Sequence, residues 1–430
     1  MLTDVKRRLY ELRLACACHI EIDLLDVNTK MQKIKRSTPD TLTLAYIAAI
    51  FVSALTTSAY AQAPSMTIYG TFDRDPRAPS AEPQGSQFRK APLASRSSIS
   101  IYGTIDAGVR HVSNTNAAGE SKLKMGSNGE YYNNRLGFKG TEDLGGGMNA
   151  HFHLESGFNT GTGASDNTDG RLFNRISSVG IAGPFGSVDF GRQPSVACKA
   201  VYAYEPFQYR YVHIIPLAGA VAGNTDGKVS RPFGTVDGPR FSNAIQYFGK
   251  FGGWTTSAEY SMGEVAGNSS AASAKAVGLG YTDGTFTIGG AYTRQKPNVG
   301  TIATPDYRDQ DQVTFGGAYK IGDIRFSGGY LNTKTETAVT SQAKNIWLGA
   351  RYDLTPLISV TSGYYRTTLK TSSREIARRN FFIVGATYAL SSRTSLYADI
   401  DQAVLHGIVA LRPAQQTRQI GTSVGISHMF

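Results

Sequence analysis

The sequence predicts an all-β fold, a closed antiparallel barrel of sixteen strands that crosses a membrane. Three observations lead to this prediction. Segments of about ten residues, in which apolar and polar side chains alternate, recur along the chain. Aromatic residues recur on the apolar face at one end of these segments. Short turns alternate with longer polar connections.

The composition suits many short strands joined by tight turns. The 430 residues include 47 glycines, 23 tyrosines and 20 phenylalanines. Three cysteines are too few for a disulfide framework. The chain carries 44 Lys and Arg against 33 Asp and Glu, a net charge of +11, but these charges are dispersed. We therefore expect no nucleic-acid partner.

Three predicted segments precede the barrel. Residues 31–63 read as a secretory signal peptide, with a basic start, the apolar run LTLAYIAAIFVSAL and small-x-small sites that end at Ala61 and Ala63. Residues 1–30 are then an extension upstream of a complete signal. Residues 64–98 repeat the motif IYGT and are rich in Pro, Ser and Arg, so we interpret them as a flexible extension with a surplus strand.

Residues 99–430 form the predicted barrel. In residues 345–352, for example, Ile346, Leu348 and Ala350 share one face and polar residues share the other. The same pattern predicts sixteen strands: 99–112, 129–142, 145–158, 170–182, 186–192, 240–248, 252–263, 273–282, 285–294, 310–320, 323–334, 342–353, 356–370, 379–390, 394–405 and 418–430.

The strand ends distinguish a membrane barrel from a water-soluble sandwich, which would show the same alternation. Long connections, such as 295–309 and 371–378, are expected at the end opposite the short turns. Aromatic girdles, short periplasmic turns and long extracellular loops are typical of outer-membrane barrels. A tyrosine lies on the apolar face just before five of the short turns: Tyr247, Tyr281, Tyr319, Tyr352 and Tyr388.

Closure of the barrel requires the last strand to pair with the first. The second copy of IYGT, at Tyr102, is followed directly by the next strand, so we assign it to the first strand. The last strand ends on an aromatic residue, Phe430, on the apolar face. We interpret Phe430 as a barrel-terminal assembly signal at the short-turn end.

Several motifs resemble one known family. They include ISIYGTIDAGV at 99–109, NNRLGFKGTEDLGGGMNAHFHLESGFN at 133–159, GRLFNRISSVGIAGPFGSVDFGRQ at 170–193 and the terminal GISHMF. Residues 99–430 resemble the Gram-negative general porins of the betaproteobacterial kind. The resemblance implies a homotrimer among the lipids of the outer membrane. It also implies passive diffusion of small hydrophilic solutes and inorganic ions.

A barrel of this size leaves an aqueous channel, so selectivity requires a constriction. The candidate is the longest connection, residues 193–239 after the fifth strand, which in the resembling family folds into the lumen. Alternation places Arg135 and Lys139 in the lumen, and the family pattern matches an arginine cluster to Arg135, Arg171 and Arg175. The predicted constriction has a basic wall and loop acids: Arg135, Lys139, Arg171, Arg175 and Arg192, with Glu205, Asp226 and Asp237.

The excess of basic candidates favours a channel that prefers anions. No convergent set of Ser, His and Asp indicates an enzyme, so we predict no catalytic residue, metal site or cofactor. His151, His153 and Glu155 share one face, but in a wet lumen we interpret them as solvated lining. The alternative function is a plugged outer-membrane barrel that acts as an adhesin or a structural protein, with residues 64–98 as the plug.

Overall fold

The computed structural model describes residues 97–430, except 117, 127–128, 168–169, 212–239, 302, 337–339 and 408–416. The predicted upstream extension, the signal peptide and the first copy of IYGT lie outside the described residues, as do Asp226 and Asp237. No helix in the described part of the chain is long and apolar enough to cross a membrane.

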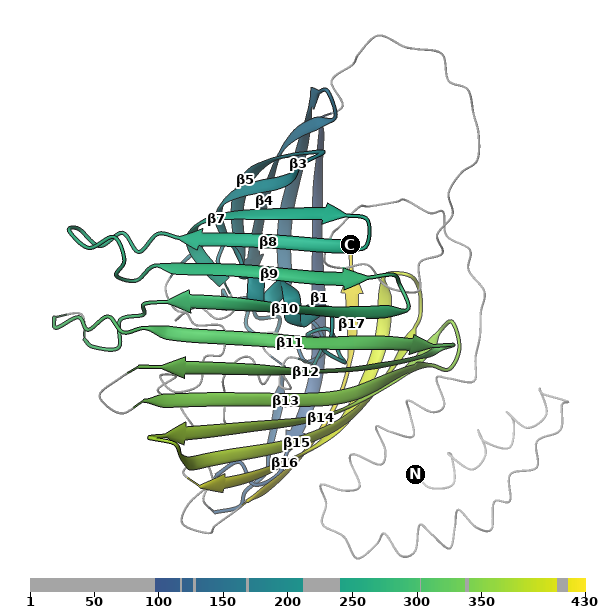
Figure 1. Ribbon diagram of the computed structural model, residues 1–430. Helices are drawn as coiled ribbons and strands as arrows, with labels where there is room; N and C mark the ends of the chain where they lie inside the picture. The colour runs from purple at the N-terminus through teal and green to yellow at the C-terminus, as the bar shows by residue number, and fades with distance from the viewer. Residues whose placement is uncertain are drawn as a thin grey trace, which may run out of the picture. The chain divides into compact units, whose positions relative to one another are not determined.

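The described residues form strands and one helix (Figure 1). The helix is α4 (Val196–Tyr202). The strands are β1 (Ser98–Val112), β2 (Lys122–Met125), β3 (Arg135–Gly145), β4 (Met148–Gly157), β5 (Ile176–Gly183), β6 (Gly186–Pro194), β7 (Arg240–Phe251), β8 (Trp254–Ser261), β9 (Ala274–Thr282), β10 (Phe286–Gln295), β11 (Gln310–Ile321), β12 (Ile324–Thr335), β13 (Ser341–Asp353), β14 (Ile358–Thr371), β15 (Arg374–Ala389), β16 (Thr394–Gly407) and β17 (Arg418–Met429).

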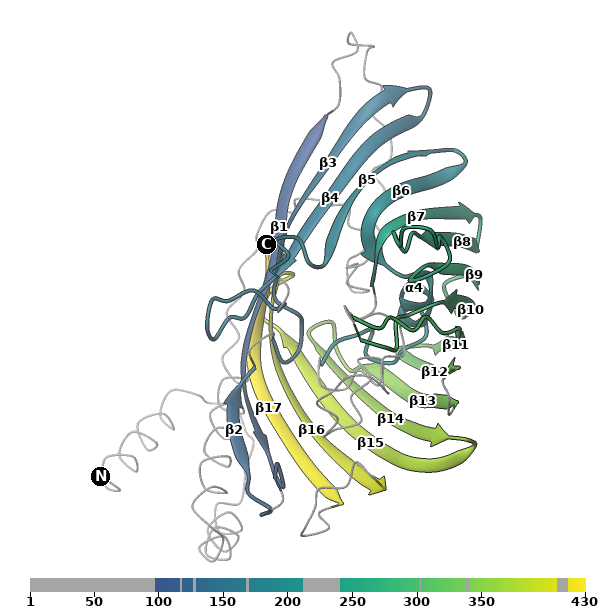
Figure 2. The same cartoon turned by 90° about the vertical axis from the view of Figure 1, so that its left-hand side faces the viewer.

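The strands form one closed antiparallel sheet, because β1 pairs with strands from both ends of the chain. One edge of β1 pairs with β17, from Thr104 opposite Met429 to Val112 opposite Gly421. Its other edge pairs with β3 and, further along, with the four-residue β2. Since β2 and β3 lie along the same edge of β1, the wall is sixteen strands around (Figure 2). The prediction of a closed sixteen-stranded barrel is confirmed.

Two predicted strands, 129–142 and 170–182, each start six residues too early, since β3 begins at Arg135 and β5 at Ile176. Residues 130–134 before β3 are not part of a strand. The carboxylate of Asp106 accepts hydrogen bonds from the backbone N–H groups of Glu130 at 2.8 Å, Tyr131 at 3.3 Å and Tyr132 at 3.2 Å. A buried carboxylate needs such donors, and they come here from a segment that can no longer pair with β1.

The connection 371–378 is shorter than the sequence suggested. Strands β14 and β15 extend until Thr371 pairs with Arg374, which leaves Ser372 and Ser373 as a two-residue turn. Both serines have positive φ, 47° and 66°, as tight hairpin turns require. The expectation of a long loop here was wrong, because alternation weakens where β15 carries several consecutive polar residues.

The outward face of the wall is apolar and carries two bands of aromatic rings. One band lies near the short turns and includes Phe286, Phe326 and Tyr352, all exposed. The second includes Tyr292, which is six residues from Phe286 along β10. At about 3.3 Å per residue, the two bands are roughly 20 Å apart along a strand. Aromatic girdles at two levels of an apolar wall are typical of membrane barrels.

The C-terminal residue closes the seam at the short-turn end. Gly103 N–H donates to the carbonyl of Phe430 at 3.1 Å, and Phe430 N–H donates to the carbonyl of Gly103 at 3.2 Å. The ring of Phe430 lies over Gly103, where an added Cβ would come within 2.5 Å of the ring Cζ. A terminal aromatic residue therefore covers the first strand at the point where the sheet closes.

We expect Phe430→Ala to reduce the yield of folded barrel on refolding into lipid vesicles. The loss of the partly covered ring, which is 38% exposed, costs about 1–2 kcal/mol at the seam. Heat-modifiable migration on gels measures the folded fraction. Phe430→Tyr, which keeps the ring, is the control and should refold as the wild type does. Equal refolding of Phe430→Ala and wild type would show that the seam does not need the aromatic ring.

Candidate pore constriction

The connection after β6 enters the lumen and begins with the short helix α4. Ser195 caps the helix, since its hydroxyl accepts a hydrogen bond from Cys198 N–H at 3.2 Å. The Val196 N–H donates to Glu259 Oε2 of β8 at 3.1 Å, and Gln246 of β7 donates to Glu259 Oε1 at 3.0 Å. Lys199 donates to the Gln246 side chain. These polar contacts fix the start of the loop to the wall.

The chain after α4 lies against a row of glycines on the inner wall, on successive strands from β11 to β15. A Cβ added to Gly349 would lie 2.6 Å from Pro206 Cγ, and one added to Gly385 would lie 2.5 Å from Tyr211 Cε2. Larger side chains at these positions would displace the loop. We call this row the glycine track: Gly316 and Gly329 under Tyr204, Gly349 under Pro206, Gly363 under Phe207 and Gly385 under Tyr211.

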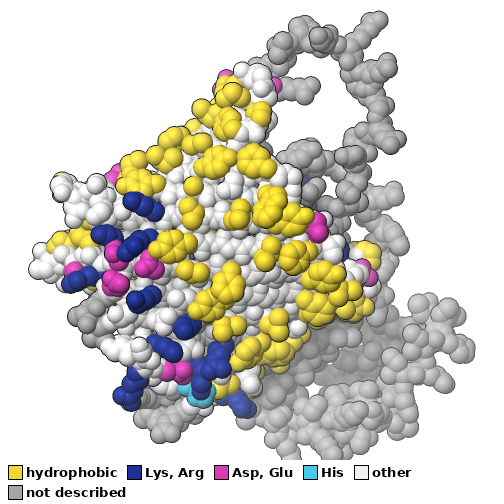
Figure 3. Space-filling view, viewed as in Figure 1, with side chains coloured by type: hydrophobic (Ala, Val, Ile, Leu, Met, Phe, Trp, Pro, Cys, Tyr) yellow, Lys and Arg dark blue, Asp and Glu magenta, His cyan; other side chains and the backbone are white. Residues whose placement is uncertain are grey.

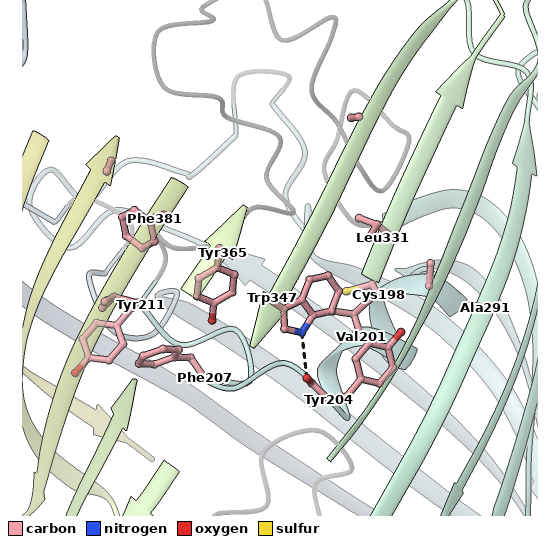
Figure 4. Close-up of a cluster of buried hydrophobic side chains, with 14 of the residues drawn as sticks. Cys198, Val201, Tyr204, Phe207, Tyr211, Ala291, Leu331, Trp347, Tyr365 and Phe381 are labelled. Atoms are coloured by element: carbon pink, nitrogen blue, oxygen red, sulfur yellow. Dashed lines mark hydrogen bonds between the residues drawn. The ribbon is translucent and has the colours of Figure 1, made fainter. Parts of the chain in front are cut away.

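Aromatic contacts hold the middle of the loop on the glycine track (Figure 4). The Trp347 indole N–H donates to the Tyr204 carbonyl at 3.1 Å, and the two rings stack with centroids 5.9 Å apart. The Tyr204 hydroxyl shares a hydrogen bond with Thr314 at 2.7 Å. Each buried polar group on these rings therefore has a partner, as buried aromatic residues require.

Glu205, the best acidic candidate from the sequence, is a buried anchor in this structure. Its carboxylate accepts hydrogen bonds from Tyr209 N–H at 2.9 Å and from the Tyr365 hydroxyl. Burial raises the pKa of the Glu205 carboxyl, and these two hydrogen bonds oppose the rise. Its partners among the described residues belong to the loop and to β14, and Arg325 is the cation that stabilises its charge.

The described part of the loop ends on the opposite side of the lumen. Tyr211 N–H donates to the Tyr131 carbonyl at 2.7 Å, and its hydroxyl donates to the Ala398 carbonyl of β16 at 3.0 Å. Arg210 Nε donates to the Tyr132 hydroxyl at 2.6 Å. Residues 195–211 thus contact β7 and β8 at one end and β15, β16 and the break between β2 and β3 at the other. The described part of the loop therefore crosses the lumen.

The basic wall is built around one carboxylate, that of Glu155 on β4. Arg175 Nε donates to Glu155 Oε1 at 2.6 Å, and Arg135 Nε lies 3.8 Å from Glu155 Oε2. The Tyr102 hydroxyl donates to the same Oε2 at 2.7 Å, and the Lys139 ammonium lies 4.3 Å from the Tyr102 ring centroid. The structure therefore brings three of the predicted cations together around a single acid.

The remaining two predicted cations are Arg192 on β6 and Arg171 in the connection before β5. Arg192 donates from Nε to the Asn174 carbonyl at 2.6 Å and from Nη1 to the Ser242 hydroxyl at 2.9 Å. Arg171 lies in the connection before β5, where its backbone forms two hydrogen bonds with the Asn167 amide, each 3.0 Å long. Both residues thus come from elements next to the Glu155 group.

Sequence reasoning missed three residues of the site. Glu155 was interpreted as solvated lining, although alternation placed it in the lumen opposite Arg135. Arg240, at the start of β7, is half-buried and interacts electrostatically with Arg175, Arg192 and Glu155. Arg210 adds a cation from the loop, 5.2 Å from the Tyr132 ring centroid. No short sequence pattern indicates Arg210 or its aromatic partners Tyr131 and Tyr132.

Cations exceed acids at the wall, and the channel there is lined by polar atoms. A narrow passage with fixed charge of one sign concentrates ions of the opposite sign. The arrangement can therefore bias diffusion by charge. The described residues contain no group of three or more His, Cys, Asp or Glu side chains placed to hold a metal ion.

Comparisons with solved structures agree with this fold. The structure titled "Anion-selective porin from Comamonas acidovorans" is 25% identical, with a TM-score of 0.63, and the match covers 78% of this chain and 100% of that chain. The trimer form of OmpT from Vibrio cholerae has a TM-score of 0.55 at 15% identity over 78% of this chain and 99% of its own. The second likeness concerns the fold alone.

Comparisons of sequence extend the likeness. The outer membrane porin protein 32 of Delftia acidovorans is 29% identical over 78% of this chain and 95% of its own length. A major outer membrane protein P.IB of Neisseria meningitidis serogroup B is 27% identical over 71% of this chain and 87% of its own. The family model described as Gram-negative porin matches residues 45–403. The chain therefore belongs to the Gram-negative porins, the outer-membrane barrels that serve as diffusion channels.

Proposed function

We propose that this porin prefers anions and conducts small hydrophilic solutes and inorganic ions without catalysis. The observation that carries the preference is the basic wall, where Arg135 and Arg175 pair with Glu155 and Lys139 lies over the Tyr102 ring beside them. Arg192 and Arg240 add charge beside it. The anion-selective porin from Comamonas acidovorans, to which the chain is similar, supports the same sign of selectivity.

We propose that the loop from Ser195 to Tyr211 sets the width of the passage, because it crosses the lumen opposite the basic wall. Glu205 acts here as an anchor of the loop rather than as an acid facing the ions. Passage needs only diffusion through water, so no residue is assigned a catalytic role. The assembly we propose is a homotrimer, in keeping with the trimer form described for the similar OmpT barrel.

Neutralising the wall should shift selectivity towards cations. We expect Arg135→Ala and Arg175→Ala each to lower the chloride-to-potassium permeability ratio about twofold to tenfold, since a charge a few ångströms from the ion path contributes about 1 kcal/mol in water. The zero-current potential in a planar bilayer under a potassium chloride gradient measures this ratio.

Lys275→Ala is the matched control for the wall variants, because Lys275 lies at an exposed position on β9. It should leave the potential unchanged. Unchanged potentials in both arginine variants would remove Arg135 and Arg175 from the selectivity mechanism. A wild-type protein without stepwise conductance would instead support the plugged barrel that acts as an adhesin or structural protein.

Filling the glycine track should widen the passage. We expect Gly385→Val to displace Tyr211 and to raise single-channel conductance with more frequent current fluctuations, because the new side chain occupies the place of the ring. Gly289→Val is the control, since a Cβ there meets no atom closer than 3.4 Å. Equal conductance of Gly385→Val and wild type would show that the loop position does not set the pore width.

The Glu205 carboxyl should make loop docking depend on pH. Because its pKa is raised in the folded protein, its contribution to stability is present below the ordinary pKa of about 4.3 and is lost as pH rises through the raised value. We expect current fluctuations to increase with pH in the wild type and to stay constant in Glu205→Gln.

Tyr365→Phe gives a second test of the same anchor. The Tyr365 hydroxyl stabilises the ionised carboxylate, so its removal should raise the pKa of Glu205 further. The pH at which fluctuations increase should then be higher than in the wild type. An onset that does not move in Tyr365→Phe, or that persists in Glu205→Gln, would assign the pH dependence to another group.

A further inference from the structure

The outward face of β13–β16 carries a group of cations at the long-loop end, just beyond the second aromatic band. Figure 3 shows Lys and Arg side chains gathered there, at the edge of the apolar surface. We call this group the basic belt and define it by four residues: Lys344 on β13, Arg366 and Lys370 on β14, and Arg378 on β15.

The strand register fixes the size of the basic belt. Lys344 and Arg378 both pair with Thr368, from opposite sides, so they occupy one row across three strands. Arg366 and Lys370 lie two residues before and after Thr368. With strands about 4.8 Å apart and a rise of about 3.3 Å per residue, the four cations cover roughly 10 Å by 13 Å.

Most of the positive charge of the basic belt is not neutralised by acids. Among the described residues, no carboxylate lies within ion-pair distance of Lys344, Arg366 or Lys370, and Arg378 Nη1 has one partner, Glu375 Oε1, at 3.6 Å. His406 on β16 pairs with Arg378 across the strands and adds no negative charge. Lys344 and Lys370 are half-buried. Their aliphatic stems can lie along the apolar wall while their ammonium groups stay accessible to a ligand outside the barrel.

A neighbouring group on the same rim is self-neutralised. Arg294 donates to Asp309 at 2.9 Å, Lys296 lies 3.5 Å from Asp309, and Arg308 lies 2.7 Å from Asp306. These cations therefore carry little net charge towards a ligand. The rim thus holds a balanced group on the β10–β11 connection and an unbalanced one on β13–β15.

The position of the basic belt identifies the ligand chemistry. Two of the cations adjoin an exposed apolar residue on their strand: Ile346 is one outward position from Lys344, and Tyr364 is one outward position from Arg366. The belt therefore lies at the level of the lipid headgroups and faces sideways, into the membrane plane. Anionic headgroups bind clusters of Lys and Arg at this level.

We propose that the basic belt binds a phosphorylated glycolipid of the outer leaflet, with its phosphates on Lys344, Arg366 and Lys370. Among the described residues, the opposite half of the barrel carries no comparable group of outward cations at this end. Its outward positions there include Leu136, Ser156, Ser177 and Met262, and Lys275 on β9 is a single cation. The face from β13 to β16 is then a lipid-facing surface of the assembly.

The test is a titration of the full-length porin in detergent with bisphosphorylated lipid A, followed by native mass spectrometry. The triple variant Lys344→Gln, Arg366→Gln, Lys370→Gln should bind the lipid at least tenfold, and up to roughly a hundredfold, more weakly than the wild type. The matched control, Arg294→Gln, Lys296→Gln, Arg308→Gln, removes the same charge from the balanced group and should change the affinity less than threefold.

Two further arms distinguish the sources of phosphate. Lipid A without its phosphates should bind weakly to the wild type. Its affinity should equal that of bisphosphorylated lipid A for the triple variant. Inorganic phosphate, added at the same concentration as the lipid, should not displace bisphosphorylated lipid A from the wild-type porin. Conductance of the triple variant checks that the barrel is intact. Equal affinity of triple variant and wild type, equal losses in both variants, or displacement by inorganic phosphate would each overturn the proposal.

Discussion

Closure of the sheet is the constraint on which the rest of this structure depends. Inside a membrane every backbone N–H and C=O must find a partner within the protein, and an open edge strand would leave a row of them unpaired. Strand β1 removes both edges at once, because it pairs with β17 on one side and with β3 and β2 on the other. Once the sheet is closed, alternate side chains face lipid or the lumen.

This constraint explains why the sequence is informative about the wall. A strand with lipid on one face and water on the other must alternate, so fourteen of the sixteen predicted strands coincide with observed ones to within five residues at each end. The predicted strand 170–182 starts too early, because β5 begins only at Ile176. The second exception is the break before Arg135, which depends on the buried carboxylate of Asp106. Asp106 lies 24 residues before Glu130 in the chain. No local sequence pattern indicates that the Asp106 carboxylate will accept hydrogen bonds from the backbone of that segment.

The constriction is predictable in part for the same reason. Alternation places Arg135 and Lys139 in the lumen, and the structure finds them beside Glu155. The role of Glu205 could not be predicted, because its partner Tyr365 is 160 residues away in the chain. Sequence alternation thus identifies which charged side chains face the lumen. Whether such a side chain faces the ions or anchors the loop depends on its tertiary contacts.

The glycine track implies that loop and barrel form a matched pair. The path of residues 204–211 depends on two matched sets of residues. One set is the large side chains of the loop, and the other is the glycines on β11–β15 that leave room for them. A constriction loop transplanted from another barrel would meet recesses shaped for different rings. Engineering a new pore diameter by loop exchange therefore requires the exchange of these wall positions as well.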